Sequence, residues 1–346
     1  MTSLHRRLAP TLAAAAALLL LTAAADAGIG PAEMYARARR GPVKSTHAPK
    51  APEPQKIPKR PWSESAPKAA EHVRRGGPLV TFVVVPLCSN EQIDCGSAVA
   101  GRPGDLAKNI YWGAVFGQRR FFERKNSGWT RVEVTRPAPG SDDPLLERAV
   151  FKREIPLAAW SASPDASGAT TEQIVVFQAV HGASIDQALD LFWKTATEGG
   201  RVRFRDGDRD RDEPIHVAGY AGHNRLMDAG AKLPPPPPSE RSRPIPSFVM
   251  ACYSEPYFGA ALRSAGSDTL VMTRNLMAPE GYVLDAITKA LGEDAPREDV
   301  RRRAVEAYAR WQRISPAAAS SIFAPGPKRT TTAELTRPEL TRASAR

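Results

Sequence analysis

Two side chains capable of nucleophilic chemistry each end an apolar run in the second half of the chain. The run that begins at Ile215 ends at Gly222-His223, and the run Phe248–Met250 is followed by Ala251-Cys252. A thiol attacks a carbonyl carbon as the thiolate, and a nearby imidazole can take its proton. Since neighbouring parallel strands end at one edge of a sheet, the sequence predicts a catalytic Cys252/His223 dyad there.

Further polar residues in the loops at this edge are candidates for supporting roles. Gly222, Asn224, Asn90 and Asp228 are expected to line the cleft or to help an oxyanion hole, which stabilises charge on the attacked carbonyl oxygen. Asn and Asp also cap turns, and that local role is the alternative for Asn90 and Asp228. His181-Gly182 ends an earlier apolar run, so His181 is the second-choice base.

The chain has three cysteines, an odd number for a protein expected to be exported. Cys88 and Cys95 are seven positions apart in one polar loop, and we expect them to form a disulfide. Cys252 is then the free thiol.

Several other chemistries lack their usual motifs. There is no Gly-rich phosphate loop, no paired zinc-binding motif and no serine nucleophile elbow, so we expect no cofactor and no metal. The acidic stretch Asp206–Asp212 has Arg211 where a calcium-binding EF-hand loop needs glycine, and it is predicted to be a solvated hairpin turn.

Two alternatives to catalysis remain open. A cysteine that ends an apolar strand is often a small buried hydrophobe, in which case the chain is a non-catalytic binding module that uses the same loops. A metal site built from Cys252, His223 and a carboxylate is a third interpretation.

The elements that must position these residues follow from the apolar pattern. Five buried strands are predicted: 79–85, 173–180, 215–220, 247–251 and 269–273. Helical stretches are predicted at 109–122, 184–192, 257–264, 280–291 and 297–314, and residues 129–159 are expected to add a hairpin or edge strands. Alternating strands and helices predict an α/β fold, with a mainly parallel sheet and helices on both faces. Strand 215–220 should lie beside strand 247–251.

The Gly222-His223 and Ala251-Cys252 pairs resemble the arrangement in caspase-like cysteine peptidases, the group of caspases, gingipains, legumains and CHAT-domain proteins. In that group one hydrophobic block ends at the catalytic histidine and the next ends in Ala-Cys or Gly-Cys. Ala265-Gly266 and the strand after it also resemble the segment that follows the nucleophile in CHAT domains. The resemblance covers roughly residues 80–291, and it implies a caspase-like three-layer sandwich and a cysteine endopeptidase acting on a peptide or protein. One departure is that Asn224 follows His223 where the family has glycine, so its side chain is expected to crowd the oxyanion-hole amide.

Three further blocks resemble a family of uncharacterised exported bacterial proteins. These blocks are Asn109–Gly113, Gly222–Asn224 and Met277–Glu280.

The ends of the chain differ from its middle in composition. Residues 1–27 have Arg6-Arg7, an Ala/Leu run too short to span a membrane, and the cleavage site Ala25-Asp26-Ala27, which together predict a signal peptide. The net charge is +11, yet Pro78–Pro327 has 30 Lys/Arg and 30 Asp/Glu. The excess therefore lies in Pro-rich, basic ends, predicted to be disordered over 28–77 and 316–346, around a folded domain at 78–315.

These features predict a periplasmic or secreted protein with no transmembrane segment after signal removal. The basic ends could contact anionic surfaces, and no nucleic-acid partner is expected.

Overall fold

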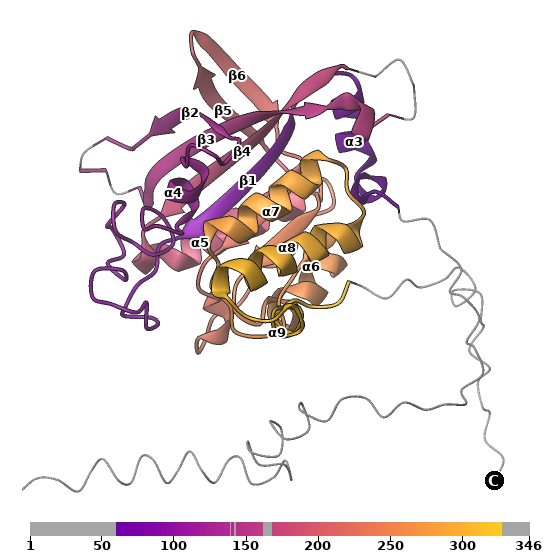
Figure 1. Ribbon diagram of the computed structural model, residues 1–346. Helices are drawn as coiled ribbons and strands as arrows, with labels where there is room; N and C mark the ends of the chain where they lie inside the picture. Colours follow the sequence, from indigo (N-terminus) through magenta and orange to yellow (C-terminus); the bar gives the residue numbers. More distant parts are fainter. Residues whose placement is uncertain (1–59, 139, 142, 162–167, 327–346) are drawn as a thin grey trace, which may run out of the picture. The chain divides into compact units, whose positions relative to one another are not determined.

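The computed structural model describes residues 60–326, except positions 139, 142 and 162–167 (Figure 1). A seven-stranded sheet has the order β2-β3-β4-β1-β7-β8-β9. The bounds of these strands are β1 Leu79–Pro86, β2 Thr130–Thr135, β3 Leu145–Pro156, β4 Thr170–Val180, β7 Val217–Ala221, β8 Ser247–Met250 and β9 Thr269–Val271. The predicted α/β class is confirmed.

The five predicted buried strands form the parallel part of the sheet. β1 pairs in parallel with β4 on one side and with β7 on the other. β7 pairs with β8, and β8 pairs with β9, also in parallel. The predicted neighbours 215–220 and 247–251 are thus adjacent. Every residue of β1 is buried, as expected for a strand covered on both faces.

The segment between the first two parallel strands supplies the antiparallel edge. β2 pairs with β3, and β3 with β4, which confirms the extra strands predicted for 129–159. A separate hairpin is formed by β5 (Arg201–Asp206) and β6 (Arg209–Pro214). Its turn contains Gly207 at φ +60°, so the acidic stretch is a hairpin turn.

Helices cover both faces of the sheet, as predicted. They are α3 Pro67–Arg74, α4 Gln118–Phe122, α5 Ile185–Glu198, α6 Ala260–Ser264, α7 Gly281–Gly292, α8 Arg297–Gln312 and α9 Pro316–Ile322. Alternate side chains of β1 belong to two apolar clusters. Val83 is in the cluster that contains residues of α3, α4, α7, α8 and α9, and Val84 is in the cluster that contains residues of α5 and α6. The result is a three-layer sandwich.

One predicted helix is mostly wrong. Only Gln118–Phe122 of the stretch 109–122 is helical, and most of 87–117 is a long folded loop. The chain doubles back at Gly113, where a Cβ would collide with the carbonyl oxygen of Leu106. Tyr111 and Trp112, two of the apolar side chains that suggested a helix, are buried although their backbone is not helical.

The folded part also extends beyond the predicted boundaries at both ends. Trp62 is fully buried, its indole nitrogen donates to Leu291 O at 2.9 Å, and α3 follows it, so the linker predicted over 28–77 ends earlier. At the other end α9 leads to the fully buried Phe323, so residues 316–326 belong to the domain. The predicted signal peptide and most of both predicted tails lie outside the described residues. None of the described helices is long and apolar enough to cross a membrane.

Strand order identifies where a ligand would bind. The chain moves from β1 to β4 on one side of it, then returns to β7 on the other side. In open α/β sheets the crevice at such a reversal, beyond the carboxyl ends of the strands, is the usual binding position.

Candidate functional site

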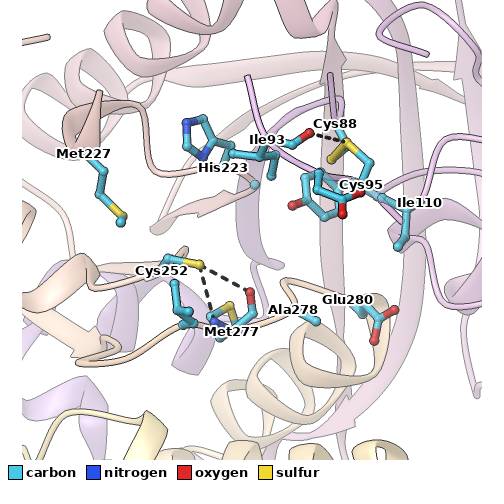
Figure 2. Close-up of a pocket in the computed structure, with 14 residues that line it drawn as sticks. Cys88, Ile93, Cys95, Ile110, His223, Met227, Cys252, Met277, Ala278 and Glu280 are labelled. Carbon is cyan, nitrogen blue, oxygen red and sulfur yellow. Dashed lines mark hydrogen bonds between the residues drawn. A yellow bond between two sulfur atoms is a disulfide. The ribbon is translucent and has the colours of Figure 1, made fainter. Parts of the chain in front are cut away.

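A cavity of about 340 Å³ lies at this crevice, and both Cys252 and His223 line it (Figure 2). Its other walls come from the loop after β1, the Ile110-Tyr111 segment and the loop after β9. Figure 2 draws His223, Cys252 and Met227 on one side and the disulfide with Ile110 on the other. The sheet thus brings the two predicted reactive side chains to one cavity.

A sharp turn at the end of β8 presents Cys252. The following residue, Tyr253, has φ +49°, a left-handed conformation that costs a residue with a Cβ about 1–2 kcal/mol. Its N–H donates to Asn275 O at 3.1 Å, which holds the turn against the loop after β9. Backbone strain of this kind is concentrated at functional sites.

The buried hydroxyl groups of Ser254 and Thr273 hold the same turn in place. Ser254 N donates to Thr273 Oγ1 at 3.0 Å, and Thr273 N donates to Ser254 Oγ at 2.8 Å. Thr273 Oγ1 also donates to the carbonyl oxygen of Ala251, the residue before the cysteine. The backbone on each side of Cys252 is therefore held by the first residues after β9.

The Cys252 thiol contacts the backbone of Met277. Met277 N donates to Sγ at 3.4 Å, and Sγ donates to Met277 O at 3.6 Å. These two contacts hold the side chain of Cys252 against the loop after β9. Among the described residues, no hydrogen bond joins Sγ to the His223 ring.

Asp228 orients His223. Both carboxylate oxygens of Asp228 lie 3.0 Å from His223 Nε2, and Tyr220 Oη donates to the backbone oxygen of His223 at 2.8 Å. A carboxylate accepts, so Nε2 carries the proton and Nδ1 is left as the basic nitrogen. Asp228 therefore lies behind the histidine, outside the cleft for which it was predicted.

A second ion pair secures this aspartate. Arg225 Nη1 lies 3.3 Å from Asp228 Oδ2, and Arg225 Nε lies 2.7 Å from Asp186 Oδ1 on α5. The short 3₁₀ turn Arg225–Met227 thus ties Asp228 to a helix of the three-layer sandwich.

Asn224 does not crowd the cavity, contrary to the prediction. Its side chain is fully buried, outside the cavity lining, and donates from Nδ2 to Cys252 O at 2.6 Å. Its Oδ1 accepts from Leu226 N at 3.1 Å, which caps the turn that carries Asp228. The amide joins the loops after β7 and β8.

The remaining predicted residues have different positions. Gly222 lines the cavity, but its N–H donates to Met250 O at 3.1 Å, so it is not an oxyanion donor. Asn90 accepts from Cys95 N and donates to Ser97 O, which is the turn role, and it is not in the cavity lining. His181 directly follows β4, on the other side of β1 from β7, and caps a 3₁₀ turn by accepting from Ala183 N. The fold does not bring this second-choice base to the cavity.

Cys88 and Cys95 form a disulfide and Cys252 is a free thiol. The disulfide is part of the cavity wall. The fully buried Asn109 holds this wall in place: it accepts from Cys88 N at 3.1 Å and donates to Cys88 O at 2.8 Å.

Sequence reasoning missed the loop after β9, which supplies Leu276, Met277, Ala278 and Glu280 to the cavity. The carboxyl-end rule that selected the other loops applies equally to this strand, so the signal was present. Tyr111 was also missed. It lines the cavity, and burial, with smaller contributions from Cys252 and Glu280, raises the pKa of its phenol.

Within the part of the chain that the structure describes, no group of three or more His, Cys, Asp or Glu side chains is arranged to hold a metal ion. Comparison with protein-family models, with curated proteins and with solved structures finds no match for this chain.

Proposed function

We propose that this protein is a thiol hydrolase, most specifically an endopeptidase, with Cys252 as nucleophile and His223 as base. The observation that carries the proposal is that the two side chains lie just after the ends of neighbouring parallel strands and line one cavity, with Asp228 at Nε2 of His223. A nucleophile, a base and a carboxylate that orients the base are the three groups that acyl transfer uses. It agrees with the resemblance to caspase-like peptidases, which rests on the sequence motifs alone.

The proposed reaction has two stages. His223 Nδ1 takes the proton of Cys252, and the thiolate attacks the substrate's carbonyl carbon. The scissile C–N bond breaks, the amine leaves with the proton from His223, and a thioester remains on Cys252. Water then gives a proton to His223 and hydrolyses the thioester, which restores the thiol.

The negative charge that forms on the substrate's carbonyl oxygen during the attack needs a hydrogen-bond donor to stabilise it. The backbone N–H of Cys252 has no acceptor among the described residues, and this residue lines the cavity. It is the oxyanion donor we propose in place of Gly222.

Alkylation of Cys252 tests the dyad, because the other two cysteines are joined. We expect the pH profile of iodoacetamide labelling to be displaced below that of an ordinary thiol, near 8.5, and to return towards it in His223→Ala. His181→Ala is the matched control and should leave the profile unchanged. A wild-type profile that is the same as that of His223→Ala would contradict the proposal.

A binding module is the second candidate, and one contact favours it. The thiol of Cys252 is hydrogen-bonded to the backbone of Met277 and not to His223, so the two side chains are not placed for direct proton transfer. Labelling of Cys252 that is independent of His223, with no cleavage of a peptide library, would support this candidate.

We also propose that the protein is exported after cleavage between Ala27 and Gly28, with its basic ends free to contact anionic surfaces. The mass of the mature protein recovered from the periplasm or culture medium tests the cleavage position.

A further inference from the structure

We infer that the cavity beside Cys252 takes an apolar side chain of the substrate, of the size of Leu, Met or Phe, on the residue whose carbonyl is attacked. This inference rests on the proposed function, since it assigns the specificity of that same site. Three observations support it: the side chains that line the cavity are mainly apolar, two of them are exposed to solvent, and the two carboxylates in the lining already accept hydrogen bonds.

The walls are built mainly from apolar side chains of separate segments. The disulfide forms one part, and the apolar contributors are Ile93, Ile110, Met227, Leu276, Met277 and Ala278. A volume of about 340 Å³ holds one large side chain together with the adjoining backbone. Binding an apolar group here is favourable because it removes the apolar surface of both partners from water.

Two of these side chains are exposed although they are large and apolar. Met227 is 38% exposed and Leu276 is 60% exposed, and they come from the loops after β7 and β9, the strands on each side of β8. Apolar residues exposed together at a cavity, instead of singly, are typical of a binding surface. They would cover the substrate side chain as it enters.

Each of the two carboxylates in the wall already accepts a hydrogen bond. Glu280 Oε2 accepts from Gln312 at 3.0 Å, and Figure 2 shows its carboxylate directed away from Cys252. Asp94 Oδ1 accepts from Gly96 N at 2.8 Å in the disulfide loop. No lysine or arginine is in the described lining, so an acidic substrate side chain would lose its hydration there without gaining an ion pair.

Cleavage of fluorogenic peptides that differ only at the attacked residue gives the first measurement. We expect kcat/KM for Leu, Met and Phe to exceed that for Lys and Asp by at least about tenfold, because a charged group must lose its hydration to enter. A preference for Lys or Asp, or no preference, would overturn the inference while leaving the hydrolase proposal standing.

Binding can be measured without turnover in Cys252→Ala. In protein labelled at the methionine methyl groups, N-acetyl-leucine methylamide should shift the signals of Met227 and Met277. The buried Met250 and Met272 provide internal controls. The corresponding lysine and aspartate amides should give shifts at least about tenfold smaller at equal concentration. If the leucine probe shifts these signals but no peptide is cleaved, the hydrolase proposal is refuted and the apolar binding pocket is supported. If there is neither a shift nor cleavage, the apolar binding pocket is refuted as well.

Two substitutions locate the effect. Ala278→Leu fills the cavity and should weaken the leucine probe by about tenfold or more, since it removes the space that the probe occupies. Val115→Leu is the matched control, because Val115 is 67% exposed and lies outside the lining. Equal loss in both variants, with unchanged unfolding midpoints, would also overturn the inference.

Discussion

At the residue scale, contacts with two neighbouring residues hold His223 of the proposed site in its orientation. His223 is 7% exposed, its backbone oxygen is held by Tyr220, and its Nε2 faces both oxygens of Asp228. These contacts fix the ring plane and the tautomer before any substrate binds. In the proposed mechanism the thiol of Cys252, in contrast, must turn from Met277 towards His223 to react.

Asp228→Asn tests whether the carboxylate sets the tautomer. The amide can donate to Nε2 and leave the proton on Nδ1, so we expect kcat to fall by about 10²–10⁴-fold and the alkylation profile of Cys252 to move towards that of His223→Ala. Asp186→Asn is the control, because it removes the other partner of Arg225 without touching the histidine. It should change kcat by less than about threefold, as expected for an exposed ion pair. Equal effects of the two variants would make Asp228 merely structural.

Sequence order was sufficient to propose Cys252 and His223, because each follows a recognisable strand. It was insufficient for Asn224 and Asp228, whose roles depend on which way a turn directs its side chains. The side chain of Asn224 was expected to crowd the oxyanion-hole amide, and it instead donates a hydrogen bond to the backbone oxygen of Cys252. No local pattern distinguishes these two outcomes.

At the scale of elements, the long loop after β1 explains most of the difference between prediction and structure. Residues 109–122 have apolar spacing that is typical of a helix, but tertiary contacts hold them otherwise. The strands were predictable because continuous β-branched runs have few alternatives in a domain of this size. The loop was not, since the partners that hold it are distant in sequence.

Glu147 on β3 is one of these partners. It is fully buried, and its carboxylate accepts from Trp112 Nε1 at 2.8 Å, from Arg119 Nη1 at 2.8 Å and from Arg136 Nε at 2.8 Å. Trp112 directly follows the two cavity residues Ile110 and Tyr111. The buried carboxylate therefore anchors the cavity wall to the sheet.

Glu147→Ala should lower the free energy of unfolding by about 3–5 kcal/mol, because it leaves the buried Trp112 Nε1 and the mostly buried Arg119 without their acceptor. Urea unfolding measures this change. Glu306→Ala, which breaks the exposed pair with Arg302, should cost less than about 1 kcal/mol. A loss below 1 kcal/mol for Glu147→Ala would mean that the loop is held mainly by its apolar contacts.

At the scale of the whole molecule, a buried histidine couples stability to pH. His216 Nδ1 accepts from Val80 N at 3.0 Å beside the ring of His72, and burial lowers the pKa of His216 to about 3. Burial also lowers the pKa of His72. The unfolded chain, with histidine near 6.5, binds these protons more readily, so stability is full above that pH and falls below it.

We expect His216 alone to reduce the free energy of unfolding by about 2 kcal/mol between pH 7 and pH 5. His216→Asn keeps an acceptor for Val80 N but does not titrate, so it should flatten that dependence. Urea unfolding at pH 5, 6 and 7 compares the two proteins. If the free energy of unfolding falls equally with pH in both proteins, groups other than His216 control the loss of stability below pH 7.

The positions of the three cysteines have a consequence for how the chain acquires its single disulfide. In an unfolded polymer the probability that two points meet falls as the three-halves power of the length between them. Cys88 and Cys95 are 7 positions apart, whereas about 160 separate Cys95 from Cys252, so chain statistics favour the short pairing by roughly 100-fold. An oxidant that meets the unfolded chain therefore closes the small ring first. Cys252 then reaches the folded state as a thiol without any isomerase having to release it from a wrong partner.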